Sequence, residues 1–384
     1  MDQGLFSLLF RRLNPFFENG QNTGPPAPKA GLDWEKLDMT NHIPVNGHVE
    51  VRFRQSTQSW SSPVLVKGNN ISVSGISPGL NYGQQCYEGL KALRQAPSAP
   101  DDEESIAIFR PTFHATRMAA SAAAVCLPQV PEELFLESVR LAVASNAGYV
   151  PPVESNGFLY IRPVLFGASD GLPLKPCEET VFAVYCHPAR AYHGVHGIKG
   201  VVCEEFDRAA PRGMGRFKVG GNYAPVSGVE KVWRHAAKAM KMGFHITLHL
   251  DSETHSLVEE FATSGFIGHK LIDGQDVLVI PRSENAIKSA TSTSLKVIAE
   301  REGWKVDESP LPFSSIGELD EVIAVGTAAA AVPIATIDQL STNKQYTFKA
   351  TSDGKLAGLA HIMLDIQRGR RQDVDGWMCK VTGF

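Results

Sequence analysis

The sequence predicts two α/β domains joined by a short linker, and three observations lead there. With 384 residues the chain is long for one hydrophobic core and comfortable for two. Strand-like and helix-like segments follow one another in both halves. A glycine-containing segment at residues 189–200 separates the halves and is typical of a hinge. We expect a tail at residues 1–31, a first domain at 32–190, a linker at 191–202 and a second domain at 203–384.

Composition indicates an ordered globular protein without a polyanionic partner. Apolar residues make up 43% and charged residues 20% of the chain, as in packed domains. The formal net charge is −4 and no basic block occurs, so we expect neither nucleic acid nor a membrane as partner. The six cysteines are scattered, and the 12 histidines show no metal-ligand spacing, so no metal is expected.

The first 31 residues differ from the rest and admit two interpretations. The segment is apolar and carries Arg11 and Arg12, which favours a mitochondrial presequence. Asp2, Glu18 and the near absence of serine count against one, and a disordered or dimer-packing tail is the other interpretation. Scattered thiols without a secretory signal indicate a reducing compartment. We therefore expect a cytoplasmic protein, with a mitochondrial location as the alternative.

The first half predicts strands followed by two helices and two further strands. The segments VEVRFR, PVLVKG and NISVSG suggest strands between residues 32 and 93. Apolar residues at helical spacing predict helices at about 112–125 and 131–147. Apolar runs at 157–166 and 181–188 predict buried strands.

The second half repeats this alternation after residue 203. A helix is expected from Tyr223 to about Met242, where Gly243 ends it. The remaining expected elements are a strand at 244–251, an apolar segment at 257–267, a helix at 294–303, a strand at 321–326 and a C-terminal helix at 356–370.

The stretch 216–223 contains the first candidate for chemistry. Lys218 stands between apolar neighbours and precedes Gly220, Gly221, Asn222 and Tyr223. Glycines let the backbone approach a bound group closely. A lysine amine that points into a pocket loses water, which makes it a nucleophile suited to Schiff-base chemistry. Taken alone the pattern is a weak signal, because most lysines are solvated surface residues.

Several other residues suit anionic groups, each with a structural alternative. Arg162 interrupts the buried strand 157–166 and needs either an anionic ligand or an internal carboxylate. Arg117 lies on a helix, where a solvated position is the usual one. The hydroxyl-rich segment 288–295 can cap a helix or bind phosphate. Gly326-Thr327 after a strand suits phosphate or tight packing.

In this order the segments resemble the branched-chain amino acid aminotransferases, which are pyridoxal 5'-phosphate (PLP) enzymes of fold type IV. The resemblance covers roughly residue 32 to the C-terminus. It implies two α/β domains with the cofactor in the cleft between them, and a homodimer. The segments that carry it are 80–91, 109–111, Arg117, 160–163, 218–223, 260–263, 291–295 and 326–328.

The resemblance also implies a cofactor site. Lys218 matches the lysine that forms the Schiff base and later moves a proton, and Tyr223 matches the tyrosine at the phenolic oxygen of the cofactor. Glu260 matches the glutamate at the pyridine nitrogen, although a slip of one residue to Glu259 is open. The residues implied to hold the phosphate are Arg117, Ala290, Thr291 and Thr327.

On the substrate side, the resemblance implies ping-pong transamination between leucine, isoleucine or valine and 2-oxoglutarate. Arg162 matches the arginine associated with the γ-carboxylate of glutamate or 2-oxoglutarate, and Ala328 lies where the α-carboxylate is expected. The other residues implied to surround the substrate are Tyr82, Tyr87, Tyr160 and Tyr192.

The chain departs from the family pattern in two places. It has Ala262-Thr263-Ser264-Gly265 where many members have Gly-Thr-Met-Asn, and it lacks a Cys-x-x-Cys after Gly326-Thr327-Ala328. Its sequence motifs are similar to those of a fungal subgroup of the family. Some members of this subgroup serve peptide secondary metabolism, so the preferred 2-oxo acid stays open. Alternatives are a D-amino acid or (R)-amine transaminase, an aminodeoxychorismate lyase, or a non-catalytic binding protein. Residues 160–163 and Tyr192 argue against the first three.

Overall fold

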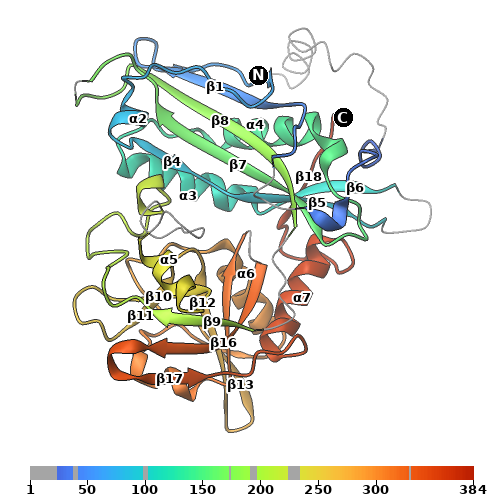
Figure 1. Cartoon of the computed structure of the whole chain (residues 1–384). Coiled ribbons are helices and arrows are strands. Elements are labelled where there is room, and N and C mark those ends of the chain that lie inside the picture. Colours follow the sequence, from blue (N-terminus) through green and yellow to red (C-terminus); the bar gives the residue numbers. More distant parts are fainter. Residues whose placement is uncertain are drawn as a thin grey trace.

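Two β-sheets, each accompanied by helices, form two lobes (Figure 1). The computed structural model describes residues 24–37, 42–97, 103–172, 174–190, 197–223, 234–327 and 330–384. Within these ranges each sheet has nine strands. This α/β architecture confirms the fold class predicted from the sequence.

The first sheet contains strands from both ends of the chain. Its strands are β1 (Gly47–Arg54), β2 (Ser59–Trp60), β3 (Val64–Lys67), β4 (Gln85–Tyr87), β5 (Leu90–Gln95), β6 (Ser105–Phe109), β7 (Gly157–Gly167), β8 (Glu179–Arg190) and β18 (Met378–Lys380). Their order is β18-β6-β5-β7-β8-β1-β2, with β3 beside β1 and β4 beside β7. The pairings are antiparallel.

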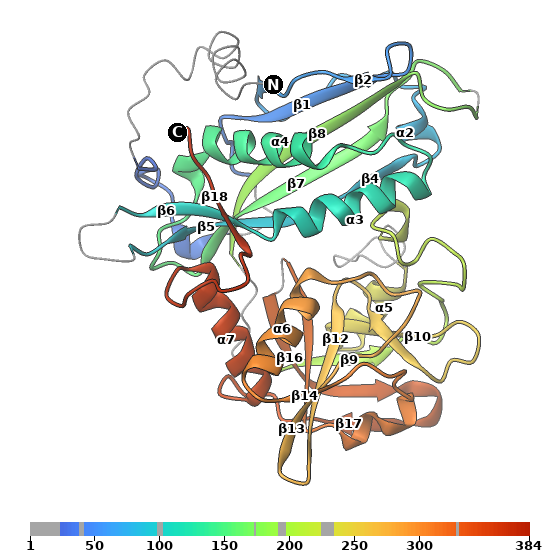
Figure 2. The same cartoon turned by 180° about the vertical axis from the view of Figure 1, so that it is seen from behind.

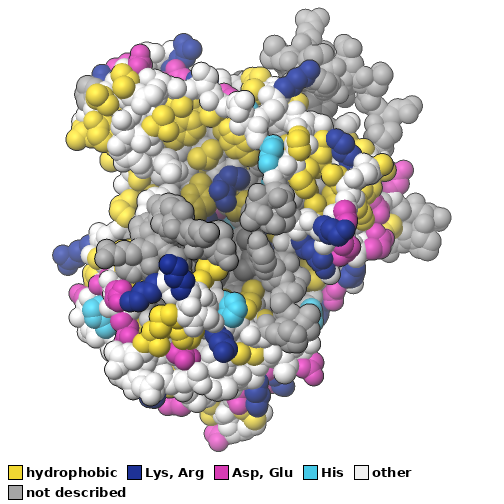
Figure 3. All heavy atoms as spheres, viewed as in Figure 1, with side chains coloured by type: hydrophobic (Ala, Val, Ile, Leu, Met, Phe, Trp, Pro, Cys, Tyr) yellow, Lys and Arg dark blue, Asp and Glu magenta, His cyan; other side chains and the backbone are white. Residues whose placement is uncertain are grey.

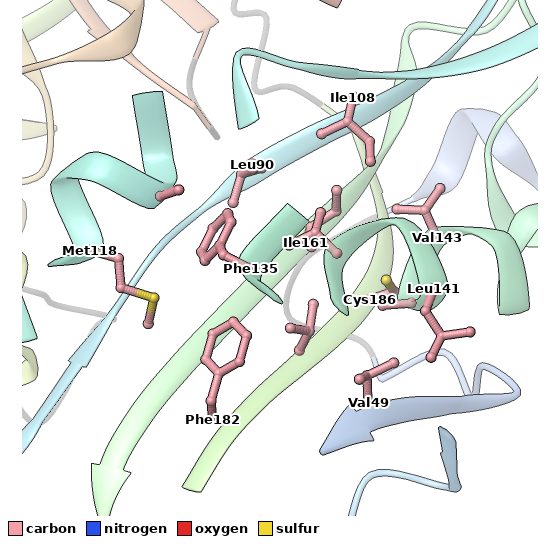
Figure 4. Close-up of a cluster of buried hydrophobic side chains, with 14 of the residues drawn as sticks. Val49, Leu90, Ile108, Met118, Phe135, Leu141, Val143, Ile161, Phe182 and Cys186 are labelled. Atoms are coloured by element: carbon pink, nitrogen blue, oxygen red, sulfur yellow. The ribbon is translucent and has the colours of Figure 1, made fainter. Parts of the chain in front are cut away.

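Helices α3 (Pro111–Ala124) and α4 (Glu132–Ser145) cover one face of this sheet (Figure 2). Side chains alternate between the faces of a strand, so Leu159 and Ile161 of β7 join the core under the helices. Figure 4 shows Phe135 of α4 close to this core, and its ring stacks on Phe182 of β8 at 5.7 Å. Burying each such side chain contributes roughly 1.5–3 kcal/mol. The intervening residues of β7 consequently point away from the helices.

The second sheet builds the lower lobe. Its strands are β9 (Ile198–Val202), β10 (Ile246–Leu250), β11 (Val258–Phe261), β12 (Gly265–Ile272), β13 (Gln275–Val279), β14 (Lys305–Asp307), β15 (Glu321–Gly326), β16 (Ala330–Gln339) and β17 (Lys344–Thr347). The order is β11-β10-β9-β16-β15-β12-β13-β14, with β17 beside β16. Helices α5 (Arg234–Lys241), α6 (Ala290–Arg301) and α7 (Lys355–Gln367) belong to this half, whereas the short α2 (Pro78–Asn81) lies in the first.

Most expected elements are confirmed, and three details differ. The segment NISVSG at 70–75 forms no strand: residues 70–74 have no regular secondary structure, and a turn begins at Gly75. Strand β9 lies within the expected linker 191–202 and pairs with β10 and β16. Strand β18 lies within the expected second domain but pairs with β6 of the first sheet. Of the helix expected from Tyr223 to Met242, the structure describes α5.

Arg110 links the two lobes where α3 begins. Its backbone is left-handed, with φ of 49°, which turns the chain sharply from β6 into the helix. Its guanidinium Nη1 donates to Thr293 Oγ1 at 2.9 Å and to Ser294 Oγ at 2.8 Å. Both acceptors lie on α6. The start of α3 is thereby held against the first turns of α6, and Arg117 of α3 and Ala290 of α6 line the same cavity.

Candidate active site

A cavity of about 250 Å³ is lined by residues of both lobes. Its charged lining residues are four cations and one carboxylate, so its electrostatic potential favours anionic ligands. Figure 3 shows basic side chains in the hollow between the upper and lower lobes. The charged residues are Arg117, Arg162, Arg208, Lys218 and Glu260.

Lys218 reaches this cavity from a backbone that is held on both sides. Its N–H donates to Ser121 Oγ of α3 at 2.9 Å, and its carbonyl accepts from the Tyr87 N–H at 3.0 Å. The amine Nζ donates to Tyr223 Oη at 2.8 Å and lies 4.7 Å from the ring centroids of both Tyr87 and Tyr223. The amine is therefore held between two aromatic rings, with one hydroxyl as its hydrogen-bond partner.

The turn after Lys218 lies close to Gln85 of β4 at Gly220. A Cβ at Gly220 would lie 2.0 Å from Nε2 of Gln85. The residues Gly220–Asn222 form one turn of 3₁₀ helix, which brings Tyr223 back beside the amine. Close approach of this turn to β4 is thus what places the tyrosine hydroxyl within reach of Lys218.

One wall of the cavity combines a half-buried cation with aromatic rings. Arg162 and Tyr160 occupy the face of β7 that points away from the helices, and Arg162 Nη2 donates to Tyr160 Oη at 3.0 Å. The guanidinium lies 4.7 Å from the ring centroid of Tyr87. Its Nε is buried and has no hydrogen-bond partner among the described residues. The internal carboxylate that the sequence left open as partner of Arg162 is not found among them either.

The neighbouring carboxylates Glu259 and Glu260 point to opposite faces of β11, as alternation requires. Glu260 lines the cavity, accepts from Arg208 Nη1 at 2.5 Å and from the Ile287 N–H at 3.2 Å. Glu259 accepts from Ser283 Oγ at 2.9 Å and Asn285 Nδ2 at 3.0 Å and is not a lining residue. Burial raises the pKa of Glu260 to about 7, although Arg208 opposes the shift. Of the two candidates, Glu260 faces the cavity.

Arg117 lines the cavity but already holds a buried carboxylate. Its Nε and Nη2 each donate to Glu88 at 2.6 Å, and Nη1 donates to the Lys288 carbonyl at 2.7 Å. Glu88 is fully buried, and His114 Nδ1 lies 2.6 Å from the same carboxylate. Burial opposes ionisation of Glu88, but Arg117 and His114 outweigh it and lower its pKa. The solvated position usual for a helical arginine does not apply here.

The first turn of α6 presents free backbone donors at the cavity. Ser289 caps the helix by accepting from the Ser292 N–H at 3.1 Å. The N–H groups of Ala290 and Thr291 have no acceptor among the described residues, as expected at a helix N-terminus. Ala290 lines the cavity, as does Thr327 at the end of β15, whereas Thr291 is buried beside it. A helix end of this kind favours anions.

Three expected substrate residues are not seen at the cavity. The hydroxyl of Tyr82 donates to the Leu172 carbonyl at 2.6 Å, and its side chain is 47% exposed, outside the cavity lining. Tyr192 and Ala328 lie outside the described residues.

Other residues of the site escaped sequence reasoning. Glu88, His114 and Ser121 act from behind the cavity wall, and Arg208 enters the cavity beside Glu260. The signal available for Glu88 was its position between Tyr87 and Gly89 in the segment 80–91 that carries the family resemblance. His114, Arg117 and Ser121 also follow helical spacing, which places them on one face of α3.

The described ranges lack both a candidate metal-ligand cluster and a candidate membrane-spanning helix. They contain no group of three or more His, Cys, Asp or Glu side chains that could hold a metal ion. No helix in the same part of the chain is long and apolar enough to cross a bilayer.

Comparison with known proteins identifies a family. Residues 104–337 match the family model described as amino-transferase class IV. The aminotransferase poxL of Penicillium oxalicum is 44% identical over 360 residues, which cover 93% of this chain and 95% of the relative. The branched-chain amino acid aminotransferase gloG of Glarea lozoyensis is 40% identical over 365 residues, covering 93% and 98%.

Solved structures show the same fold at lower identity. The branched-chain amino acid aminotransferase from Escherichia coli superposes with a TM-score of 0.67 at 22% identity, covering 87% of this chain and 99% of that one. The branched-chain amino acid aminotransferase from Thermobaculum terrenum, in its PLP form, gives a TM-score of 0.65 at 17% identity, covering 88% and 99%.

The cavity fits the cofactor of this family. A phosphate suits the free N–H groups of α6 and the nearby guanidinium of Arg117, and an aldehyde suits a lysine amine shielded by aromatic rings. The buried Nε atoms of Arg162 and Arg208 lack partners among the described residues, so the cavity retains donors for further anionic groups. The chain belongs to the class IV aminotransferases, and its cofactor is pyridoxal 5'-phosphate.

Proposed function

We propose that this aminotransferase exchanges the amino group between a branched-chain L-amino acid and 2-oxoglutarate in two half-reactions. The observation that supports it is the wall formed by Arg162, Tyr160 and Tyr87. A guanidinium with an unpartnered buried Nε can bind a distal carboxylate. The aromatic faces beside it can receive an aliphatic side chain instead. One pocket can then take leucine and glutamate in turn, as both half-reactions require.

In this proposal Lys218 performs the proton transfer. Bound PLP supplies the electron sink that makes the substrate Cα–H acidic. Lys218 Nζ would hold the cofactor and, when substrate is bound, would accept the proton from the substrate Cα. Tyr223 Oη, which accepts from Nζ at 2.8 Å, orients that amine. Glu260 would interact with the ring nitrogen of the cofactor, and Arg208 favours the ionised form of this carboxylate.

The phosphate group of the cofactor would be held by residues of both lobes. Arg117, the N–H groups of Ala290 and Thr291, and the Thr327 hydroxyl would hold it. These donors come from α3, α6 and the end of β15, which the Arg110 contacts tie together in part. The cofactor would therefore bridge both lobes.

A homodimer is part of the proposal. Around α2 the apolar side chains of Ile76, Leu80 and Leu172 are 43%, 64% and 49% exposed. In Figure 3 hydrophobic side chains gather on the upper lobe, and in Figure 1 no labelled helix lies over this side of β7 and β8. Exposed apolar patches of this kind favour association. Sedimentation or light scattering of the purified protein should give twice the chain mass of 41.7 kDa, and a monomer would refute this part.

The decisive experiment separates the two half-reactions. Arg162→Met should raise KM for 2-oxoglutarate by about 10- to 100-fold, because it removes a charged hydrogen-bond donor, and should change KM for L-leucine by less than about threefold. Lys218→Ala should abolish turnover with every donor. Equal effects of Arg162→Met on both substrates would contradict the dual use of the pocket.

The choice of substrates tests the alternatives. Leucine, isoleucine and valine are compared as donors with other L-amino acids, D-amino acids and (R)-amines. Turnover with another L-amino acid alone would keep the aminotransferase and replace the branched-chain specificity. Activity on D-amino acids or (R)-amines alone would replace the stereochemical assignment, and PLP binding without any turnover would indicate a binding protein.

A further inference from the structure

Glu88 is a buried carboxylate to which neither the cofactor chemistry nor the proposed substrates assign a role. It lies between Tyr87 and Gly89, which both line the cavity, but it is not itself a lining residue. Its side chain is fully buried. Four donors surround it: Arg117 Nε and Nη2, each at 2.6 Å, His114 Nδ1 at 2.6 Å and the Gly89 N–H at 3.2 Å.

The geometry fixes the plane of the Arg117 guanidinium. Bidentate pairing uses both carboxylate oxygens and leaves one orientation for the fork. The Lys288 carbonyl takes a further N–H at 2.7 Å. An arginine has five N–H donors, so two stay available on the Nη atoms of this cavity-lining side chain. Because the Arg117 side chain is already fixed in one conformation, a ligand in the cavity meets these two donors without a change of rotamer.

His114 anchors the carboxylate from the other side. A carboxylate can only accept, so the Nδ1 that faces Glu88 must carry the proton. His114 is itself buried, with 1% exposure, and stands one helical turn before Arg117 on α3. Glu88 therefore cannot move toward the cavity without breaking bonds to two residues of the same helix.

Two roles for Glu88 make opposite predictions for phosphate binding. If Glu88 only neutralises Arg117, its removal exposes a full positive charge and phosphate should bind more tightly. If it sets the orientation of Arg117, its removal lets the guanidinium turn and phosphate should bind more weakly.

We propose that Glu88, supported by His114, is a positioning residue for the phosphate of the cofactor, because it holds Arg117 in the orientation that receives it. This inference rests on the family cofactor and is independent of the substrate class proposed above. Because the Glu88 carboxylate weakens the electrostatic attraction of Arg117 for a phosphate, the contribution of Glu88 to phosphate binding lies in the preorganised orientation of Arg117.

The test measures affinity rather than turnover. The full-length protein, freed of cofactor, is titrated with PLP and separately with pyridoxal, which lacks the phosphate, and binding is followed by absorbance. For Glu88→Gln the ratio of PLP affinity to pyridoxal affinity should fall by about 10- to 100-fold, the range of one or two charged hydrogen bonds. Pyridoxal affinity itself should stay within about twofold.

A matched control distinguishes positioning from the general loss of a buried carboxylate. Glu321 is also buried and accepts from the N–H groups of Lys355 and Leu356 at 2.9 Å each, at the start of α7. Glu321→Gln should leave the affinity ratio unchanged. When Glu88→Gln is added to Arg117→Lys, the ratio of PLP affinity to pyridoxal affinity should fall little further, because Glu88 acts through Arg117 and the two effects are then not additive.

Four outcomes would overturn the inference. They are an unchanged ratio in Glu88→Gln, an increased ratio, an equal loss for both ligands, and full additivity with Arg117→Lys. If Glu88→Gln fails to fold by circular dichroism, His114→Gln takes its place, with a smaller fall of the ratio supporting the inference and an unchanged ratio refuting it. A wild-type protein that binds pyridoxal as tightly as PLP would instead refute the phosphate site itself.

Discussion

Lys91 gives the sharpest prediction about stability, because the fold buries its amine without an anionic partner among the described residues. The residue lies on β5 opposite Tyr160 and is 8% exposed. Its Nζ lies 4.5 Å from the ring centroid of Phe158. Burial, with a smaller contribution from the Arg368 charge, lowers the pKa of Lys91 to about 7 from its ordinary value of 10.5. The folded protein therefore releases a proton that the unfolded chain keeps.

The sign of the pH dependence follows from this difference. Between pH 7 and 10.5 the unfolded chain binds more protons at Lys91 than the folded one, so stability rises with pH. Each pH unit of that window changes the free energy of unfolding by about 1.4 kcal/mol, so the buried charge lowers it by about 5 kcal/mol at low pH. About 2 kcal/mol of this cost should disappear between pH 7 and pH 9.

Lys91→Met removes the charge and keeps a side chain of similar length. The variant should be more stable than the wild type at pH 7, and its advantage should shrink by about 2 kcal/mol at pH 9. Urea unfolding at both pH values, followed by circular dichroism, measures the four free energies. Lys67→Met on β3 is the matched control, because Lys67 is exposed in the folded state and should give no such change. An advantage that is constant or grows with pH would refute the reasoning.

Two further predictions concern the cavity. In Gly89→Ala the new Cβ would lie 2.2 Å from Tyr160 Oη, so the tyrosine ring must move by roughly 1 Å, which disturbs its hydrogen bond to Arg162. Steady-state kinetics should show kcat/KM for 2-oxoglutarate reduced by about 10- to 100-fold. An unchanged kcat/KM would show that Tyr160 is not needed for binding 2-oxoglutarate. Arg208→Met removes the cation that opposes the raised pKa of Glu260. The acid limb of the pH–rate profile should therefore shift to higher pH by at least about one pH unit. An acid limb at the same pH would show that Glu260 does not determine the pH dependence.

The sequence predicted the elements whose patterns are local. Helices α3 and α4 follow from apolar residues at helical spacing, and β7 from its apolar run. Lys218 and Tyr223 are separated by one short turn, so their meeting in space depends on few residues. Prediction worked where the pattern and the structure share the same stretch of chain.

Local sequence patterns could not predict contacts between residues that are far apart in the chain. Glu88 is joined to Arg117 across 29 positions and Arg110 to Ser294 across 184, and no local pattern encodes either distance. The alternation on β11 could not choose between Glu259 and Glu260, because the inward face is set by the packing of the whole sheet. The segment 70–75 has β-branched residues but lies outside the paired strands, since strand propensity needs a partner strand.

The pairing of β18 with β6 has a consequence for biosynthesis. During translation the upper lobe can assemble β5, β6, β7 and β8 early, but the open edge of β6 waits for Met378–Lys380. Until these residues leave the ribosome, β6 presents unpaired backbone groups that could recruit a strand from another nascent chain. A product truncated before Met378 would keep the edge of β6 exposed, whereas in the full chain the three-residue strand β18 forms this edge, so the truncated form should associate more readily with other chains.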